Sequence, residues 1–142
     1  MIYIEQITPI LTWQLRRDVL YPGEFKHNMG LEEDENGIHF GAFKDNKLVG
    51  IISLFQNGTD FQFRKLAVDP SAQKMGIGNS LLQWVINYTR ENGGNRIWCN
   101  ARDTAFGFYL KAGFVFTGQV FSKSGINYEI MEKVLAPLGD VH

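Results

Sequence analysis

The residues with the clearest chemical potential form a glycine-rich run, Gln73-Lys74-Met75-Gly76-Ile77-Gly78. The run stands between an apolar, strand-like stretch that ends at Pro70 and an amphipathic stretch that begins near Ile77. Gly76 and Gly78 have no Cβ, so the backbone there can approach an anion closely. The first N–H groups of a following helix have no partner within the helix and suit a pyrophosphate. The run therefore predicts a phosphate-binding turn, and the alternative is an ordinary strand-to-helix loop.

Acid–base chemistry has several candidate side chains, and the sequence does not rank them. The groups that could accept a proton are Glu24, His27, His39 and Glu129. An exposed histidine or acid is usually only a solvated side chain. The acidic cluster from Glu32 to Glu35 could attract a cationic amine, or it could be a solvated surface. The arginines available to hold a carboxylate or phosphate with two hydrogen bonds are Arg16, Arg17, Arg64 and Arg102.

Size and composition favour one domain, residues 1–142, with a loose tail at residues 136–142. The chain has 142 residues, of which 44% are hydrophobic, enough to bury one core. A formal net charge of −1 gives no general attraction to nucleic acid or to anionic membranes. The apolar runs are much shorter than the roughly 20 residues that span a bilayer, and Met1 to Glu5 lacks the pattern of a secretion signal. We therefore expect a cytoplasmic protein, in which the one cysteine, Cys99, packs in a strand.

The elements that must position the glycine-rich turn alternate between strands and helices. Strands are predicted at Ile2–Ile7, Ile38–Phe43, Leu48–Phe55, Phe61–Val68, Arg96–Ala101, Phe114–Phe121 and Asn127–Val134. Helices are predicted at Pro9–Leu20, from Ile77 to Gly93-Gly94, and at Thr104–Lys111 before Gly113. Turn residues that tolerate positive φ occur at Asp45-Asn46, Asn57-Gly58 and Ser124-Gly125.

Hydrophobic spacing predicts which faces of the helices and strands are buried. In the first helix, Arg16, Arg17 and Asp18 lie opposite the apolar stripe. The stripe of the second helix consists of Ile77, Leu81, Trp84, Val85 and Tyr88. In the strand Phe61–Val68, Phe61 and Phe63 alternate in one phase, and Leu66 and Val68 in the other. A β-bulge at Arg64-Lys65 would bring both pairs to one face and leave backbone amides without strand partners.

The order of these features resembles the GNAT superfamily of acyl-CoA-dependent N-acyltransferases. The resemblance covers residues 38–116: a bulged strand, the phosphate turn, a long helix, a strand, and a short helix with the sequence Ala105-Phe106-Gly107-Phe108-Tyr109-Leu110-Lys111-Ala112-Gly113-Phe114. It implies a mixed α/β fold with a central, mostly antiparallel sheet of about seven strands and about four flanking helices. It also divides the chain into a variable, substrate-side region at residues 1–37, a pyrophosphate motif at 61–94 and a second cofactor and catalytic motif at 95–116.

The resemblance implies acetyl-CoA as co-substrate and no metal. By position, Leu66, Ala67 and Val68 would offer main-chain hydrogen bonds to the pantetheine arm, as an added strand does. The residues that would cradle the pyrophosphate, mainly through N–H groups, are Gln73, Lys74, Met75, Gly76, Ile77, Gly78, Asn79 and Ser80. Asn100 and Phe106 would contact the rest of the cofactor. The alternative for Asn100 is to cap the helix that follows.

The implied reaction is acetyl transfer to a primary amine by direct attack on the thioester. Tyr109 would be the general acid for the leaving thiolate, and the alternative is a tyrosine buried against the sheet. The backbone amide of Leu66 or Ala67, freed by the bulge, would polarise the carbonyl. Some family members carry a glutamate base on the bulged strand, where this chain has Gln62, which cannot accept a proton at neutral pH.

Three functions remain open, together with a monomer or a homodimer. The first is an N-acetyltransferase that acts on a small molecule or on a peptide or protein amine. The second, motivated by Gln62, is a non-catalytic acyl-CoA-binding module or sensor. The third is a nucleotide-phosphate-binding protein, which is weakly supported because the run lacks the G-K-[ST] ending of a P-loop.

Overall fold

The computed structural model describes residues 1–136, so the predicted loose tail lies outside the described residues except for Ala136. The chain forms two compact units. Unit 1 consists of Met1–Phe55 with Phe63–Val85, and unit 2 of Gln56–Gln62 with the described residues from Ile86 onward. Strand β4 (Asp60–Val68) and helix α2 (Ile77–Glu91) each begin in one unit and end in the other.

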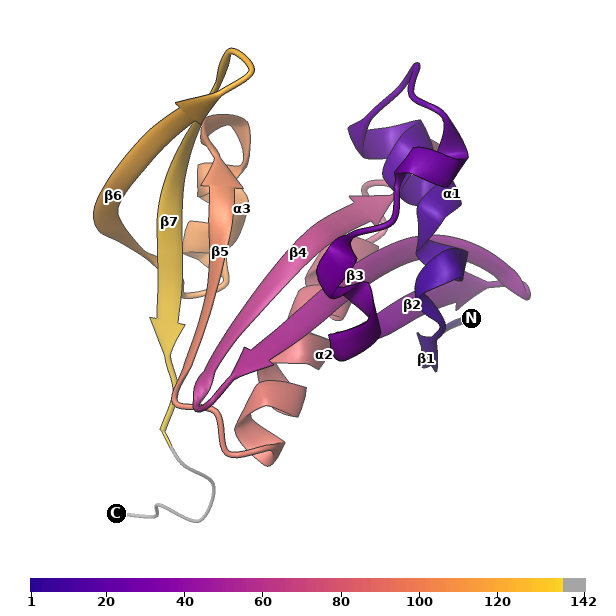
Figure 1. Ribbon diagram of the computed structural model, residues 1–142. Helices are drawn as coiled ribbons and strands as arrows, with labels where there is room; N and C mark the ends of the chain where they lie inside the picture. Colours follow the sequence, from indigo (N-terminus) through magenta and orange to yellow (C-terminus); the bar gives the residue numbers. More distant parts are fainter. Residues whose placement is uncertain (137–142) are drawn as a thin grey trace. The chain divides into compact units, whose positions relative to one another are not determined.

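Seven strands form one sheet in the order β1-β2-β3-β4-β5-β7-β6 (Figure 1). The remaining strands are β1 (Ile2–Ile7), β2 (Ile38–Lys44), β3 (Lys47–Asn57), β5 (Arg96–Arg102), β6 (Val115–Lys123) and β7 (Ile126–Val134). The pairs β1–β2, β2–β3, β5–β7 and β6–β7 are antiparallel, and β4 runs parallel to β5. The predicted mixed α/β fold with about seven mostly antiparallel strands is confirmed.

The first predicted helix is helical over its whole predicted range, but little of it is α-helix. It consists of the 3-10 turn η1 (Pro9–Thr12), the short α1 (Trp13–Leu15) and the wider π-turn η2 (Arg16–Leu20). Two further 3-10 turns, η3 (Lys26–Asn28) and η4 (Glu32–Asn36), follow before β2. Leu15 of this segment packs with Ile51 of β3 and Ala67 of β4 in the core of unit 1. The segment therefore covers one face of the sheet in unit 1.

Helix α2 covers the other face of β3, because a Cβ on Gly50 would lie 3.0 Å from side-chain atoms of both Ile77 and Leu81. The buried residues of the helix are Ile77, Leu81, Leu82, Val85, Ile86 and Thr89. Trp84, predicted as part of this stripe, is 43% exposed, because it lies at the edge of the stripe and turns its ring toward Phe40. The helix ends at Glu91, and the predicted terminating residue Gly93, with φ +79°, lies in the turn that follows.

In unit 2, the 3-10 turn η6 (Asp103–Ala105) and helix α3 (Phe106–Lys111) follow β5. A last 3-10 turn, η5 (Pro70–Ala72), precedes α2 in unit 1. The turn residues Asp45, Asn46, Ser124 and Gly125 have positive φ, as predicted. The predicted turn at Asn57-Gly58 is shifted by one residue: Asn57 is the last residue of β3, and the turn is formed by Gly58, with φ +63°, and Thr59.

Candidate functional site

The glycine-rich run forms an exposed turn that leads directly into α2. Residues 73–76 are exposed, and Ile77 is buried as the first residue of the helix. Lys74 and Gly76 have φ of +68° and +78°, the left-handed region that favours glycine. The amide of Ser80 donates to the Gly76 carbonyl at 3.0 Å. The amides of the three preceding residues therefore come before the first bond of the helix and have no partner within it.

The side chain of Gln73 holds the turn to the end of β4, because its Nε2 donates to the Val68 carbonyl at 3.0 Å. At the other end of the turn, the Ser80 hydroxyl donates to the Gly76 carbonyl, also at 3.0 Å. A Cβ on Gly76 would meet nothing within 4 Å, so the space beside this residue is open. The turn thus presents free backbone amides and the positive end of α2 to open space, an arrangement that fits a pyrophosphate.

The irregularity predicted at Arg64-Lys65 of β4 is confirmed, because Lys65 has φ +58° in the middle of the strand. Phe61 lies beside Gly94 and Thr89, near the end of α2, whereas Ala67, with the same parity, packs with Leu15. Leu66, Ala67 and Val68 follow the irregularity directly and lead into the glycine-rich turn.

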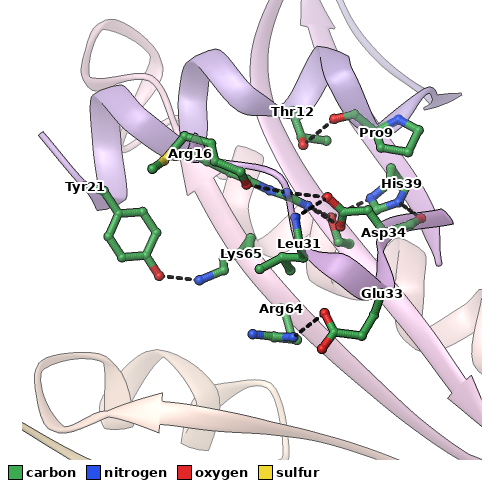
Figure 2. Close-up of polar contacts among 12 residues, drawn as sticks. Pro9, Thr12, Arg16, Tyr21, Leu31, Glu33, Asp34, His39, Arg64 and Lys65 are labelled. Atoms are coloured by element: carbon green, nitrogen blue, oxygen red, sulfur yellow. Dashed lines mark hydrogen bonds and ion pairs between the residues drawn. The ribbon is translucent and has the colours of Figure 1, made fainter. Parts of the chain in front are cut away.

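A pocket of about 280 Å³ lies in unit 1, and Lys65 forms part of its wall. Its other polar lining residues are Tyr21, Glu24 and Asn28, and Met29, Gly30 and Leu31 complete it. The Lys65 ammonium donates to the Tyr21 hydroxyl and lies 4.5 Å from the centre of its ring (Figure 2). The lining of the pocket therefore comes both from the segment after η2 and from the irregular residue of β4.

A buried ionic network fixes the segment that forms the other wall of this pocket. Arg16 is fully buried and holds the Asp34 carboxylate with two hydrogen bonds of 2.8 and 3.0 Å (Figure 2). It also donates to the Met29 carbonyl and to the Ser53 hydroxyl, each at 3.0 Å. The prediction that Arg16 lies on the polar outer face is wrong, because its charge is matched inside the protein. Arg16 is therefore not available to a ligand.

The acidic cluster also differs from a uniformly solvated surface. Asp34 is 4% exposed, whereas Glu32, Glu33 and Glu35 are exposed. Burial alone would raise the pKa of Asp34, but hydrogen bonds from Arg16 and from the Leu31 amide hold that pKa below its usual value. Glu33 pairs with Arg64 at 3.5 Å. Two of the four acids are thus paired with arginines of unit 1.

The structure separates the four candidate proton acceptors. His39 is 2% exposed, and its two ring nitrogens are within hydrogen-bond distance of the Ser53 hydroxyl and the Asp34 carbonyl. His27 is exposed and stacks on Phe25. Glu129, in unit 2, accepts a hydrogen bond from the Gly118 amide. Glu24 alone among the four lines the pocket.

Tyr109 belongs to unit 2 and sits among aromatic rings. Its ring centre is 5.2 Å from that of Phe108 and 5.9 Å from that of Phe114. Burial, reinforced by Cys99 and opposed by Arg102, raises the pKa of the Tyr109 phenol well above its usual range. Burial likewise raises the pKa of Cys99 to about 12, so this thiol is an inert core group. The phenol of Tyr109 therefore stays protonated at physiological pH.

The other predicted residues of unit 2 lie on β5, α3 and the start of β4. Asn100 is exposed on β5 and does not cap the following turn, whose N-cap is Arg102 without a side-chain bond. Phe106 begins α3 and packs edge-to-face on Phe116, with ring centres 5.0 Å apart. Gln62 is half-buried and opposite Trp98 in the β4–β5 ladder.

Sequence reasoning missed the pocket, although one signal pointed toward it. Tyr21 and Asn28 belong to a loop without periodicity, and such loops cannot be placed from spacing. Lys65, by contrast, stood at the predicted bulge, where a side chain is turned away from the regular alternation. Among residues 1–136, no three His, Cys, Asp or Glu side chains are grouped as metal ligands. No helix in that range is long and apolar enough to cross a membrane.

Residues 14–135 match a family model described as the acetyltransferase (GNAT) domain. An uncharacterized N-acetyltransferase of Bacillus subtilis, YitI, is 28% identical over 145 residues, which is 95% of this chain and 97% of that protein.

Two solved structures share the fold. The first is the ribosomal-protein-S18-alanine N-acetyltransferase of Escherichia coli, with a TM-score of 0.81, 17% identity, and coverage of 99% of this chain and 97% of that one. The second is a GNAT family acetyltransferase of Elizabethkingia anophelis with acetyl-CoA bound, with a TM-score of 0.74, 19% identity, and coverage of 94% and 98%.

Proposed function

The chain belongs to the GNAT family of acetyltransferases, and on that premise we propose that it transfers the acetyl group of acetyl-CoA to a primary amine. The observation that carries the proposal is the turn at Gln73–Gly78, with two left-handed residues and open space beside Gly76. The backbone N–H groups of residues 74–79 hold the pyrophosphate, and Gln73 fixes the turn to β4. Leu66, Ala67 and Val68 bind the pantetheine arm along β4. Asn100 and Phe106 are assigned to the cofactor on the family resemblance alone.

The reaction forms one bond and breaks one. The neutral amine nitrogen attacks the carbonyl carbon of the thioester, the C–N bond forms, and the C–S bond breaks with its electron pair on sulfur. We assign the backbone N–H of Leu66 as the hydrogen-bond donor to the carbonyl oxygen, which becomes negative during the attack. One proton leaves the nitrogen and one reaches the sulfur, so the products are an amide and the CoA thiol.

Each proton needs a group that can exchange it. An alkyl amine with a pKa near 10 is neutral to only about one part in a thousand at neutral pH, so removal of its proton assists the reaction. We assign this proton to Glu24, because it is the candidate acceptor that lines the pocket. On the family resemblance alone, we assign the proton of the leaving thiolate to the Tyr109 phenol, which desolvation keeps protonated.

The test combines turnover with a variant of the turn. Wild-type protein should release CoA thiol from acetyl-CoA in the presence of a suitable amine, and mass spectrometry should find the acetylated amine. Gly76→Val forces a β-branched residue into φ +78° and projects its side chain into the open space beside the turn. We expect the KM for acetyl-CoA to rise at least about tenfold.

Gly58→Val is the matched control, because Gly58 also has a positive φ of +63° and open space around it but lies in the β3–β4 turn. Its KM for acetyl-CoA should stay unchanged. Equal KM values in the two folded variants would reject the assigned turn. Tight binding of acetyl-CoA without turnover of any amine would instead favour the non-catalytic binding module.

A further inference from the structure

The pocket of unit 1 carries both signs of charge, which restricts the molecules that it can receive. Glu24 contributes a carboxylate and Lys65 an ammonium, and the Tyr21 hydroxyl and Asn28 amide add polar contacts. Met29 and Leu31 supply an apolar part. Its volume of about 280 Å³ is just below the usual range for small-molecule sites, so it suits a compact ligand.

Lys65 is positioned so that its charge is available to a ligand. The left-handed backbone of Lys65 and its bond to the Tyr21 hydroxyl hold the ammonium at the pocket wall. An ammonium has three N–H donors, and the Tyr21 bond uses one of them. Within the described residues, Lys65 takes part in no ion pair, whereas the neighbouring acids Asp34 and Glu33 are paired with arginines.

The part of the pocket lining that comes from residues 28–31 is held in place independently of any ligand. The buried Arg16 donates to the carbonyl of Met29 and to Asp34, and the Asp34 carboxylate in turn accepts from the Leu31 amide at 2.9 Å. The segment that contributes Asn28, Met29 and Leu31 is therefore fixed by two buried hydrogen bonds of Arg16 and by the half-buried bond from the Leu31 amide to Asp34. Such a wall is preformed, so little ordering opposes the entry of a ligand.

We propose that this pocket binds the acceptor, and that the acceptor is a small amine that also carries an anionic group, a carboxylate or a phosphate. Lys65, with the Tyr21 hydroxyl, binds the anionic group, and Glu24 faces the amine. This inference rests on the proposed function, because Lys65 directly precedes Leu66, to which the acyl carbonyl is assigned. A simple alkylamine would leave the Lys65 charge unmatched, and a polyamine would place a second cation against it.

The test uses pairs of amines with and without the anionic group, compared at equal concentrations of the neutral amine because esterification also lowers the pKa of the amino group. The common free amino acids are compared with their methyl esters, and aminoethyl phosphate is compared with ethanolamine, by thiol release from acetyl-CoA. Putrescine and a short peptide without acidic residues represent the other acceptor classes. For the best amino acid or for aminoethyl phosphate, kcat/KM should exceed that of its partner at least about tenfold, the discrimination that one charged contact gives.

Variants of Lys65 identify the source of this discrimination. Lys65→Met keeps the length of the side chain and removes its charge, so the KM for the anionic amine should rise about tenfold while the KM for the matched ester changes little. Lys65→Arg should retain most of the preference. Lys47→Met is the control, since Lys47 is an exposed lysine of the same unit at the start of β3.

Calorimetric titration of the same amines into protein saturated with CoA separates this inference from the proposed function. If the anionic amines bind in a Lys65-dependent way but no amine is acetylated, the proposed function fails and the pocket assignment stands. Equal turnover of acid and ester, or a preference for putrescine or the peptide, would overturn the pocket assignment and leave the acetyltransferase intact. Absence of both binding and turnover of the anionic amines would also overturn it.

Discussion

Tyr109 is the residue whose proposed role depends most directly on a single proton. Its half-buried phenol has a raised pKa, so the protonated form persists at alkaline pH, although the phenol is then a weaker acid. If the phenol protonates the leaving sulfur, Tyr109→Phe should lower kcat about a hundredfold and leave the KM for acetyl-CoA unchanged. The kcat of the wild type should show no decline from tyrosine ionisation up to about pH 10.

Tyr128→Phe provides the comparison for Tyr109→Phe, since Tyr128 is another tyrosine of unit 2 whose ring stacks on Phe121. Steady-state kinetics and circular dichroism of both variants would separate lost chemistry from lost packing. Equal kcat values for Tyr109→Phe and wild type would assign the sulfur proton to water and leave Tyr109 as a packing residue.

At the scale of elements, the Arg16–Asp34 pair joins the helical segment before Tyr21 to the turn η4. Asp34→Asn would leave the Arg16 guanidinium buried and unmatched, since an amide carries no charge. We expect the free energy of unfolding to fall by about 3–5 kcal/mol in urea titrations near neutral pH. Glu33→Gln, which breaks the exposed pair with Arg64, should cost at most about 1 kcal/mol.

The Arg16–Asp34 pair also makes the free energy of unfolding depend on pH. The pKa of Asp34 is lowered in the folded state, so its contribution is present above the ordinary value of 3.8 and is lost as the pH falls through the lowered one. The stability gap between wild type and Asp34→Asn should therefore shrink below about pH 4. A gap that stays constant over that range, or equal losses for Asp34→Asn and Glu33→Gln, would show that the pair contributes little.

The sequence predicted the strands and the long helix closely, because hydrophobic spacing reports which faces are buried. The alternation of Phe61, Phe63, Leu66 and Val68 even located the irregular residue at Lys65. Spacing could not predict that Arg16 turns inward, because its burial depends on Asp34, a partner from another segment. For the same reason, the pocket of Tyr21, Asn28 and Lys65 could be found only from the structure: its walls come from a loop and a strand far apart in the sequence.

At the scale of the whole molecule, we expect CoA to stabilise the folded chain against unfolding. The expectation follows from the family match over residues 14–135 and from the seven-stranded sheet. A ligand that binds only the folded state raises the free energy of unfolding by about 2.7 kcal/mol when its concentration is about a hundredfold above its Kd. For a chain of this size, the expected rise in Tm with CoA is about 5–10 °C. Scanning calorimetry would measure it.

The choice of ligand separates the remaining classes of function. CoA and acetyl-CoA both carry the pyrophosphate assigned to the turn, so either should raise the Tm of wild type and of Gly58→Val, and should have little effect on Gly76→Val. ATP also carries phosphates but lacks the pantetheine arm assigned to Leu66–Val68, so its effect should be much smaller. An equal rise with ATP would mean that the turn recognises phosphates without the arm, and would revive the nucleotide-binding alternative against the acetyltransferase.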